Sequence, residues 1–169
     1  LNVLKPAGKT SFAVVSLVRR WSGERRVGHA GTLDPDATGV LVVCLGQAAR
    51  IVEYLAGAGK TYRAEIELGV ATDTYDAAGK VVGRSDPLSV TEESVRQVLS
   101  TFRGSIAQVP PMHSAIHYKG KRLYELARKG IEVDREPRQV EISRLELLVW
   151  QPPLVTIEVN VALRDTWMV

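Results

Sequence analysis

The stretch from Gly28 to Gly39, Gly-His-Ala-Gly-Thr-Leu-Asp-Pro-Asp-Ala-Thr-Gly, constrains the fold more than any other part of the sequence. It holds three glycines, a proline, a histidine and two aspartates, and it leads directly into the apolar run Val40–Val43. A short apolar run bounded by such breaking residues is typical of a buried strand. The pattern therefore predicts a tight loop feeding a buried strand. Polar groups on such a loop are candidates for binding or catalysis, although Asp34-Pro35 alone also fits an ordinary turn.

The flanking sequence mixes helical and strand patterns in irregular order. Ser11 is a candidate N-cap for a helix ending in Arg19-Arg20, and Ser89 to Glu92 reads as a capping box for a helix stopped by Gly104. Further predictions are a helix over 47–55 and strands over 1–4, 60–68, 139–149 and 154–161. Because strict βαβ alternation is absent, we expect an α+β fold with one mixed, largely antiparallel sheet flanked by helices and loops.

The segment Lys60–Leu68 alternates between apolar and polar residues, which predicts a half-buried strand. Its first inward residue is Tyr62, where an aromatic ring with a polar tip could border a pocket, although core packing is the commoner role. The following segment Thr72–Gly79 holds two aspartates three residues apart. It lacks the further acidic ligands of a calcium loop, so a hydrogen-bonded turn between strands is favoured over a metal site.

Composition is that of a soluble globular protein: 45% of the 169 residues are hydrophobic, 24% are charged, and the net charge is +3. The single cysteine, Cys44, excludes an intrachain disulfide, favours a cytoplasmic protein, and reads as a buried apolar residue. The longest uncharged stretch, 37–49, is too short for a membrane span.

Two basic clusters are candidates for contact with a polyanion. Four arginines at positions 19, 20, 25 and 26 surround Trp21 just before the glycine-rich stretch; they fit either a solvated helix end or a phosphate contact. The segment Lys119–Arg138 carries seven Lys and Arg residues interleaved with Tyr118 and Tyr124. Basic and aromatic side chains in alternation are typical of an RNA-binding groove, and a solvated helix over 121–129 explains some of the charges.

The stretch 28–41 resembles, without gaps, the signature of the TruB family, bacterial synthases that convert uridine 55 of tRNA to pseudouridine. The resemblance continues upstream through Leu4-Lys5-Pro6-x-Gly8-x-Thr10-Ser11. Downstream it includes Lys60-Thr61-Tyr62-Arg63, Thr72-Asp73-Thr74-x-Asp76-x-x-Gly79 and Gly120-Lys121-x-Leu123-Tyr124.

This resemblance implies the pseudouridine synthase fold and an isomerase that needs no cofactor or metal. It implies that Asp34 is the catalytic aspartate and that His29 helps to displace the flipped nucleotide. It further implies that Tyr62 stacks on the flipped base and that Arg63 and Asp76 lie near the site. With Lys121 and Arg122 as candidate phosphate contacts, we expect the partner to be the T arm of tRNA. We expect a cytoplasmic monomer with no membrane association and no obligate protein partner.

The sequence also departs from the family pattern. His113 replaces an aromatic residue and His117 replaces a lysine, and residues 160–169 replace the family's Cys-Ser-x-Gly-Thr-Tyr-Ile-Arg, whose arginine pairs with the catalytic aspartate. Residues 1–169 are thus expected to be a catalytic domain incomplete at its C-terminus, without the family's C-terminal RNA-binding domain and below normal turnover. A catalytically silent tRNA-binding or RNA-chaperone fragment is an alternative. A glycosidase is a second alternative, although it would need two carboxylates poised across one sugar bond.

Overall fold

The computed structural model describes residues 1–112, 114 and 116–163, and the chain divides into two compact units. Unit 1 is Leu1–Ala58, and unit 2 begins at Gly59. Helices and antiparallel sheets occur in both, which confirms the predicted α+β class. Instead of one sheet, however, the described strands form a three-stranded sheet, a four-stranded sheet and two separate hairpins. Within those residues no helix is long and apolar enough to cross a membrane.

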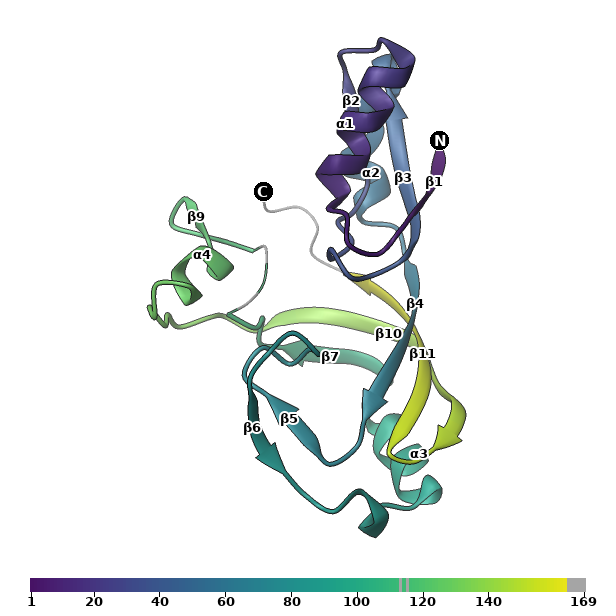
Figure 1. The fold of residues 1–169 in the computed structure, drawn as a ribbon, viewed down its shortest axis with the longest axis vertical. Coiled ribbons are helices and arrows are strands. Elements are labelled where there is room, and N and C mark those ends of the chain that lie inside the picture. Colours follow the sequence, from purple (N-terminus) through teal and green to yellow (C-terminus); the bar gives the residue numbers. More distant parts are fainter. Residues whose placement is uncertain (113, 115, 164–169) are drawn as a thin grey trace. The chain divides into compact units, whose positions relative to one another are not determined.

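Unit 1 consists of a small sheet covered by one helix (Figure 1). Its elements are β1 (Asn2–Lys5), α1 (Ser11–Ser22), β2 (Val27–His29), β3 (Gly39–Leu45), the 3-10 helix η1 (Gly46–Ile51) and α2 (Val52–Ala56). The strand order is β1-β3-β2, with both neighbours antiparallel to β3. The predicted helix over 47–55 is thus half 3-10 helix.

The core of unit 1 reflects the helical spacing of apolar residues in α1 and their two-residue alternation in β3. Val14, Val15 and Val18 form one stripe of α1, and this stripe packs against Val27 of β2 and against Leu41 and Val43, two residues apart on β3. Each of the six side chains is at least 94% buried, and full burial of such a side chain contributes about 1.5–3 kcal/mol. Cys44 is also buried, as predicted.

The start of α1 differs from the prediction by one residue. Thr10, not Ser11, is the N-cap, and its hydroxyl accepts a hydrogen bond from the amide of Ala13. At the other end Gly23 adopts a left-handed conformation and its amide donates to the carbonyl of Arg19, which ends the helix. Because Thr10 satisfies the helix terminus, the hydroxyl of Ser11 is released for another role.

Unit 2 is built on a four-stranded antiparallel sheet of order β4-β11-β10-β7 (Figure 1). The strands of this sheet are β4 (Lys60–Glu67), β7 (Gly104–Gln108), β10 (Arg138–Gln151) and β11 (Leu154–Leu163). The remaining elements are β5 (Val70–Thr72), β6 (Val81–Arg84), the 3-10 turn η2 (Pro87–Ser89), α3 (Glu92–Thr101), β8 (His117–Tyr118), β9 (Lys121–Arg122) and α4 (Leu123–Ala127). The predicted pair of strands around Pro152-Pro153 is confirmed as β10 and β11.

The capping of α3 also differs in detail from the prediction. Its capping box joins Thr91 to Ser94, not Ser89 to Glu92: the Thr91 hydroxyl accepts from the Ser94 amide, and the Ser94 hydroxyl accepts from the Thr91 amide. The helix ends with Phe102 as C-cap, before Gly104.

The prediction that β4 is half-buried is wrong. Every residue of β4 from Thr61 to Glu67 is exposed, and Tyr62 and Ile66 on the expected inward face are each 39% exposed. The reason is position: β4 is at the edge of the sheet, and α3 packs on β10, two strands away. Alternation correctly predicts a strand, but it carries no information on whether a layer covers its apolar face.

Candidate active site

The predicted glycine-rich loop is residues 30–38, between β2 and β3 of unit 1. Its two ends need glycine, because Gly31 has φ 98° and Gly39 has φ 143°, values that other residues rarely adopt. Near the middle, the amide of Ala37 donates to the carbonyl of Asp34, so a local turn does form as the Asp-Pro pair suggests.

The backbone on both sides of Asp34 is fixed by buried groups from the N-terminal segment. On one side the hydroxyl of Ser11 donates to the carbonyl of Leu33 (3.1 Å) and accepts from its amide (3.0 Å). On the other side the carbonyl of Pro35 accepts from the ammonium of Lys5 (2.9 Å) and from the amide of Gly8 (2.8 Å). We call these four hydrogen bonds the clamp.

Lys5 is the residue that sequence reasoning missed. It is fully buried, and its Nζ donates to three carbonyls, those of Pro6 (2.9 Å), Lys9 (2.7 Å) and Pro35 (2.9 Å). A buried ammonium is costly unless its donors are satisfied, and here all three N–H groups have an acceptor. The sequence shows a lysine between an apolar run and a proline. Nothing in it shows that one of the three acceptors, the Pro35 carbonyl, lies 30 residues away.

Asp34 itself is presented to solvent. Its residue is exposed although Leu33 beside it is half-buried, and among the described residues its carboxylate has no hydrogen bond or ion pair. A carboxylate held on a fixed backbone with its oxygens unengaged is available to act on a bound molecule.

His29 is at the end of β2 and is the second residue of the stretch that predicted the site. Its Nδ1 is 2.7 Å from the carbonyl oxygen of Gly31. Because a carbonyl only accepts, Nδ1 is the donor in this hydrogen bond. His29 is half-buried, and this hydrogen bond restrains the direction of its ring.

Tyr62 and Arg63 belong to unit 2, as neighbours on β4 whose side chains leave opposite faces of the sheet. Tyr62 pairs with Val159 of β11. The guanidinium of Arg63 forms an ion pair with Glu158 (3.0 Å), which also pairs with Arg144 (3.3 Å). Arg144 further hydrogen-bonds Glu146, which raises the pKa of Arg144 and lowers that of Glu146. Arg63 therefore takes part in a network of ion pairs on the surface of the sheet.

Asp76 stabilises the turn between β5 and β6. Its Oδ1 accepts from the hydroxyl of Thr74 (2.7 Å) and from the amide of Ala78 (3.0 Å). This confirms the predicted hydrogen-bonded turn. A Cβ added at Gly79 would clash with the Thr74 hydroxyl and crowd the Asp73 carboxylate, so a larger residue there would displace these side chains. Among the described residues no group of three or more His, Cys, Asp or Glu side chains could hold a metal.

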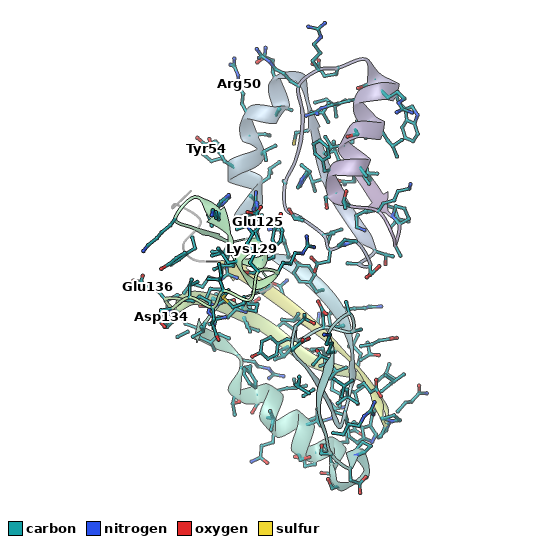
Figure 2. The ribbon with its side chains drawn as sticks, turned by 60° about the vertical axis from the view of Figure 1, so that its left-hand side comes forward. Arg50, Tyr54, Glu125, Lys129, Asp134 and Glu136 are labelled. Atoms are coloured by element: carbon teal, nitrogen blue, oxygen red, sulfur yellow. The ribbon has the colours of Figure 1, made fainter. Side chains whose placement is uncertain are left out.

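Lys121 and Arg122 form the two-residue strand β9, paired with His117 and Tyr118 of β8. Lys121 is exposed and Arg122 is half-buried. The segment around them is less uniformly basic than its Lys and Arg content suggests: Figure 2 shows Glu125, Asp134 and Glu136 in the same part of unit 2 as Lys129. Arg135 pairs with Glu132 (3.4 Å), and Arg138 hydrogen-bonds Gln108, its pKa lowered by burial. His113 and residues 164–169 lie outside the described part of the chain.

Comparisons with known proteins place this geometry in a family. Residues 19–166 match the family model "TruB family pseudouridylate synthase (N terminal domain)". The tRNA pseudouridine synthase B of Symbiobacterium thermophilum is 56% identical over 94% of this chain and 54% of its own length. That of Clostridium tetani is 49% identical over 95% of this chain and 55% of its own. The chain therefore spans about half the length of these curated relatives.

Solved structures agree with the sequence match. A chain in the crystal structure of a Cbf5-Nop10-Gar1 complex has a TM-score of 0.70 and 30% identity, over 98% of this chain and 40% of that one. A chain in the structure of an H/ACA RNP bound to a substrate RNA containing 2'-deoxyuridine has a TM-score of 0.65 and 27% identity, over 98% and 38%. With the family model covering most of its length, the chain belongs to the TruB family of pseudouridylate synthases.

Proposed function

We propose that the protein containing this chain isomerises uridine 55 in the T loop of tRNA to pseudouridine, with Asp34 as its essential carboxylate. The observation that carries the proposal is the clamp: buried Lys5 and Ser11 fix the backbone at Pro35 and Leu33 while the carboxylate between them is exposed. The names of the relatives, tRNA pseudouridine synthase B, support tRNA as the substrate.

The chemistry has few requirements, and the chain offers a candidate for each. The bond between ribose C1' and uracil N1 breaks, the base turns, and a bond forms between C1' and C5. C5 loses its proton and N1 gains one, so the product is an isomer of uridine. Asp34 is proposed to act on the sugar or the base. The target must also leave its stack, which costs a few kcal/mol. His29 as a wedge and Tyr62 as a stacking ring are proposed to offset that cost.

The remaining expectations belong to the same proposal. The protein acts as a cytoplasmic monomer on the T arm of tRNA, without a cofactor; the bacterial sources of the relatives and the single buried cysteine support the compartment. The pseudouridine synthase catalytic domain is proposed to extend over residues 1–169.

The proposal is tested by incubating the full-length protein with tRNA tritiated at C5 of uridine. Isomerisation releases the tritium to water. In unlabelled tRNA the same reaction leaves the mass unchanged. Binding without tritium release would establish the silent RNA-binding alternative. Release of free uracil would establish a glycosidase.

Tyr62 gives a prediction that separates stacking from chemistry. Tyr62→Phe should retain tRNA affinity and lose rate, because the ring is kept and the hydroxyl is lost, whereas Tyr62→Leu should lose both. The residue is 39% exposed, so neither change should unfold unit 2. Dissociation constants and single-turnover rates are the measurements. Equal rates for phenylalanine and tyrosine would reduce Tyr62 to a packing role.

Lys121 and Arg122 give a prediction about phosphate contacts. Changing both to glutamine should weaken the binding of all tRNAs alike and flatten the log-log salt dependence by about one unit. The matched control is Arg84→Gln with Arg96→Gln, which removes two positive charges from β6 and α3. Loss confined to one loop sequence would argue for base readout instead.

A further inference from the structure

The positive charge of the chain is concentrated in unit 1. Residues 1–58 contain seven Lys and Arg against four Asp and Glu, whereas residues 59–169 contain fifteen of each. The whole excess of +3 therefore resides in the unit that carries Asp34, and none of it comes from the unit that carries the predicted basic groove.

Within unit 1 the excess comes from the arginines, which lie toward the end opposite the Asp34 loop, because Lys5 and Lys9 are balanced in number by Asp34 and Asp36. The loop is bonded to Ser11, the first residue of α1, and with ~1.5 Å rise per residue the last residue, Ser22, is about 17 Å away along the helix. The amide of Gly46, just after β3, donates to the carbonyl of Arg26 (2.7 Å), so the end of β3 and the start of η1 lie at this far end too. The arginines just before the loop in sequence are therefore not close to it in space.

Four arginines are exposed at or near this end. They are Arg20 in the last turn of α1, Arg25 and Arg26 after its C-cap, and Arg50 on η1. Figure 2 shows Arg50 projecting away from the body of unit 1. None of the four side chains forms an ion pair or hydrogen bond within the described residues, in contrast to Arg19, which donates to the carbonyl of Val27. The nearby carboxylate of Glu24 accepts from the backbone amide of Arg26.

Trp21 adds an aromatic surface to the same end. It is in the last turn of α1 and is 77% exposed, an unfavourable position for so large an apolar side chain. Stabilisation of the helix dipole accounts for a cation at Arg20, but that effect falls off within the last turn and does not extend to Arg25, Arg26 or Arg50. Unpaired arginines at the same helix end as an exposed indole match a nucleic-acid backbone with a base or ribose to stack on.

We propose that Arg20, Trp21, Arg25 and Arg26, the distal surface, form a second RNA-binding site that holds tRNA phosphates away from the reacting uridine. This inference rests on the proposed function for the identity of the RNA. Its role is affinity and alignment: the distal surface holds the substrate at one end of α1 while Asp34 acts at the other.

The test measures tRNA binding by the full-length protein directly, so it can be read whether or not tritium is released. Arg20→Gln with Arg25→Gln should raise the Kd for whole tRNA about tenfold and flatten the salt dependence by about one unit. Single-turnover release at saturating tRNA should be unchanged. The control is again Arg84→Gln with Arg96→Gln. All these side chains are exposed, so folding should be retained.

Trp21 provides an independent arm of the experiment. Trp21→Leu should weaken binding several-fold without changing the salt slope, because stacking releases no counterions, and Trp21→Phe should restore most of the affinity. An unchanged Kd in the Arg20/Arg25 variant, or an equal loss of tRNA affinity in the control pair, would overturn the proposal that the distal surface binds tRNA. If the proposed function is wrong, the wild-type protein would instead bind tRNA without releasing tritium.

Discussion

Asp34→Asn is expected to abolish pseudouridine formation while leaving the protein folded and bound to tRNA. The substitution preserves shape and removes only the negative charge, and the exposed carboxylate has no partner among the described residues. Loss of a group that makes or breaks a bond reduces turnover by about 10⁴-fold or more. Stability should change by less than about 0.5 kcal/mol, because no buried contact is lost.

The same loop supplies a matched control for this experiment. Asp36 is also exposed, two residues further on, and Asp36→Asn removes the same charge. Tritium release by the Asp36 variant should remain within a few-fold of wild type. An Asp34→Asn protein that turns over within tenfold of wild type would remove Asp34 from the chemistry, and an equal loss in both variants would indicate a general charge effect.

Lys5→Met is expected to destabilise unit 1 strongly. It leaves the carbonyls of Pro6 and Lys9 without their buried donor, while Pro35 keeps only the amide of Gly8. Loss of a buried charged donor is strongly unfavourable, and we expect the free energy of unfolding to fall by roughly 3 kcal/mol. Denaturant titration of the full-length protein measures this.

The clamp also predicts a catalytic effect separate from unfolding. Movement of the Asp34 backbone by about 1 Å would cost on the order of 10²-fold in rate, with tRNA affinity nearly retained. The control is Lys9→Met, which removes an exposed lysine from the same segment. If the Lys5 variant, measured where circular dichroism shows it folded, releases tritium at the wild-type rate, then the clamp stabilises unit 1 without aligning Asp34.

Local patterns predicted the elements of this fold, and long-range contacts decided where the prediction failed. The glycine-rich stretch and the apolar run after it correctly placed the loop and β3, because breakers and apolar periods act within a few residues. The burial of Lys5 depends on a carbonyl 30 residues away, and the exposure of β4 depends on which strand α3 covers. Neither is encoded in a local pattern.

The site shows the same division between local and distant information. Asp34 was predicted on the loop, where the structure has it, whereas His29 was predicted on the same loop and is instead the last residue of β2. The roles of both residues stay predictions. Ser11 was predicted as a cap, but the adjacent Thr10 satisfies the helix, and Ser11 instead bonds Leu33 twice. Two neighbouring residues with the same capping chemistry cannot be told apart by propensity.

The most direct test of the account maps pseudouridine at single-nucleotide resolution in tRNA treated with wild-type full-length protein and with Asp34→Asn in parallel. The account predicts one modified position, uridine 55 of the T loop, in the wild-type reaction and no modification by the variant. Pseudouridine at other positions alone, modification by the Asp34→Asn protein, or free uracil in place of pseudouridine would contradict it.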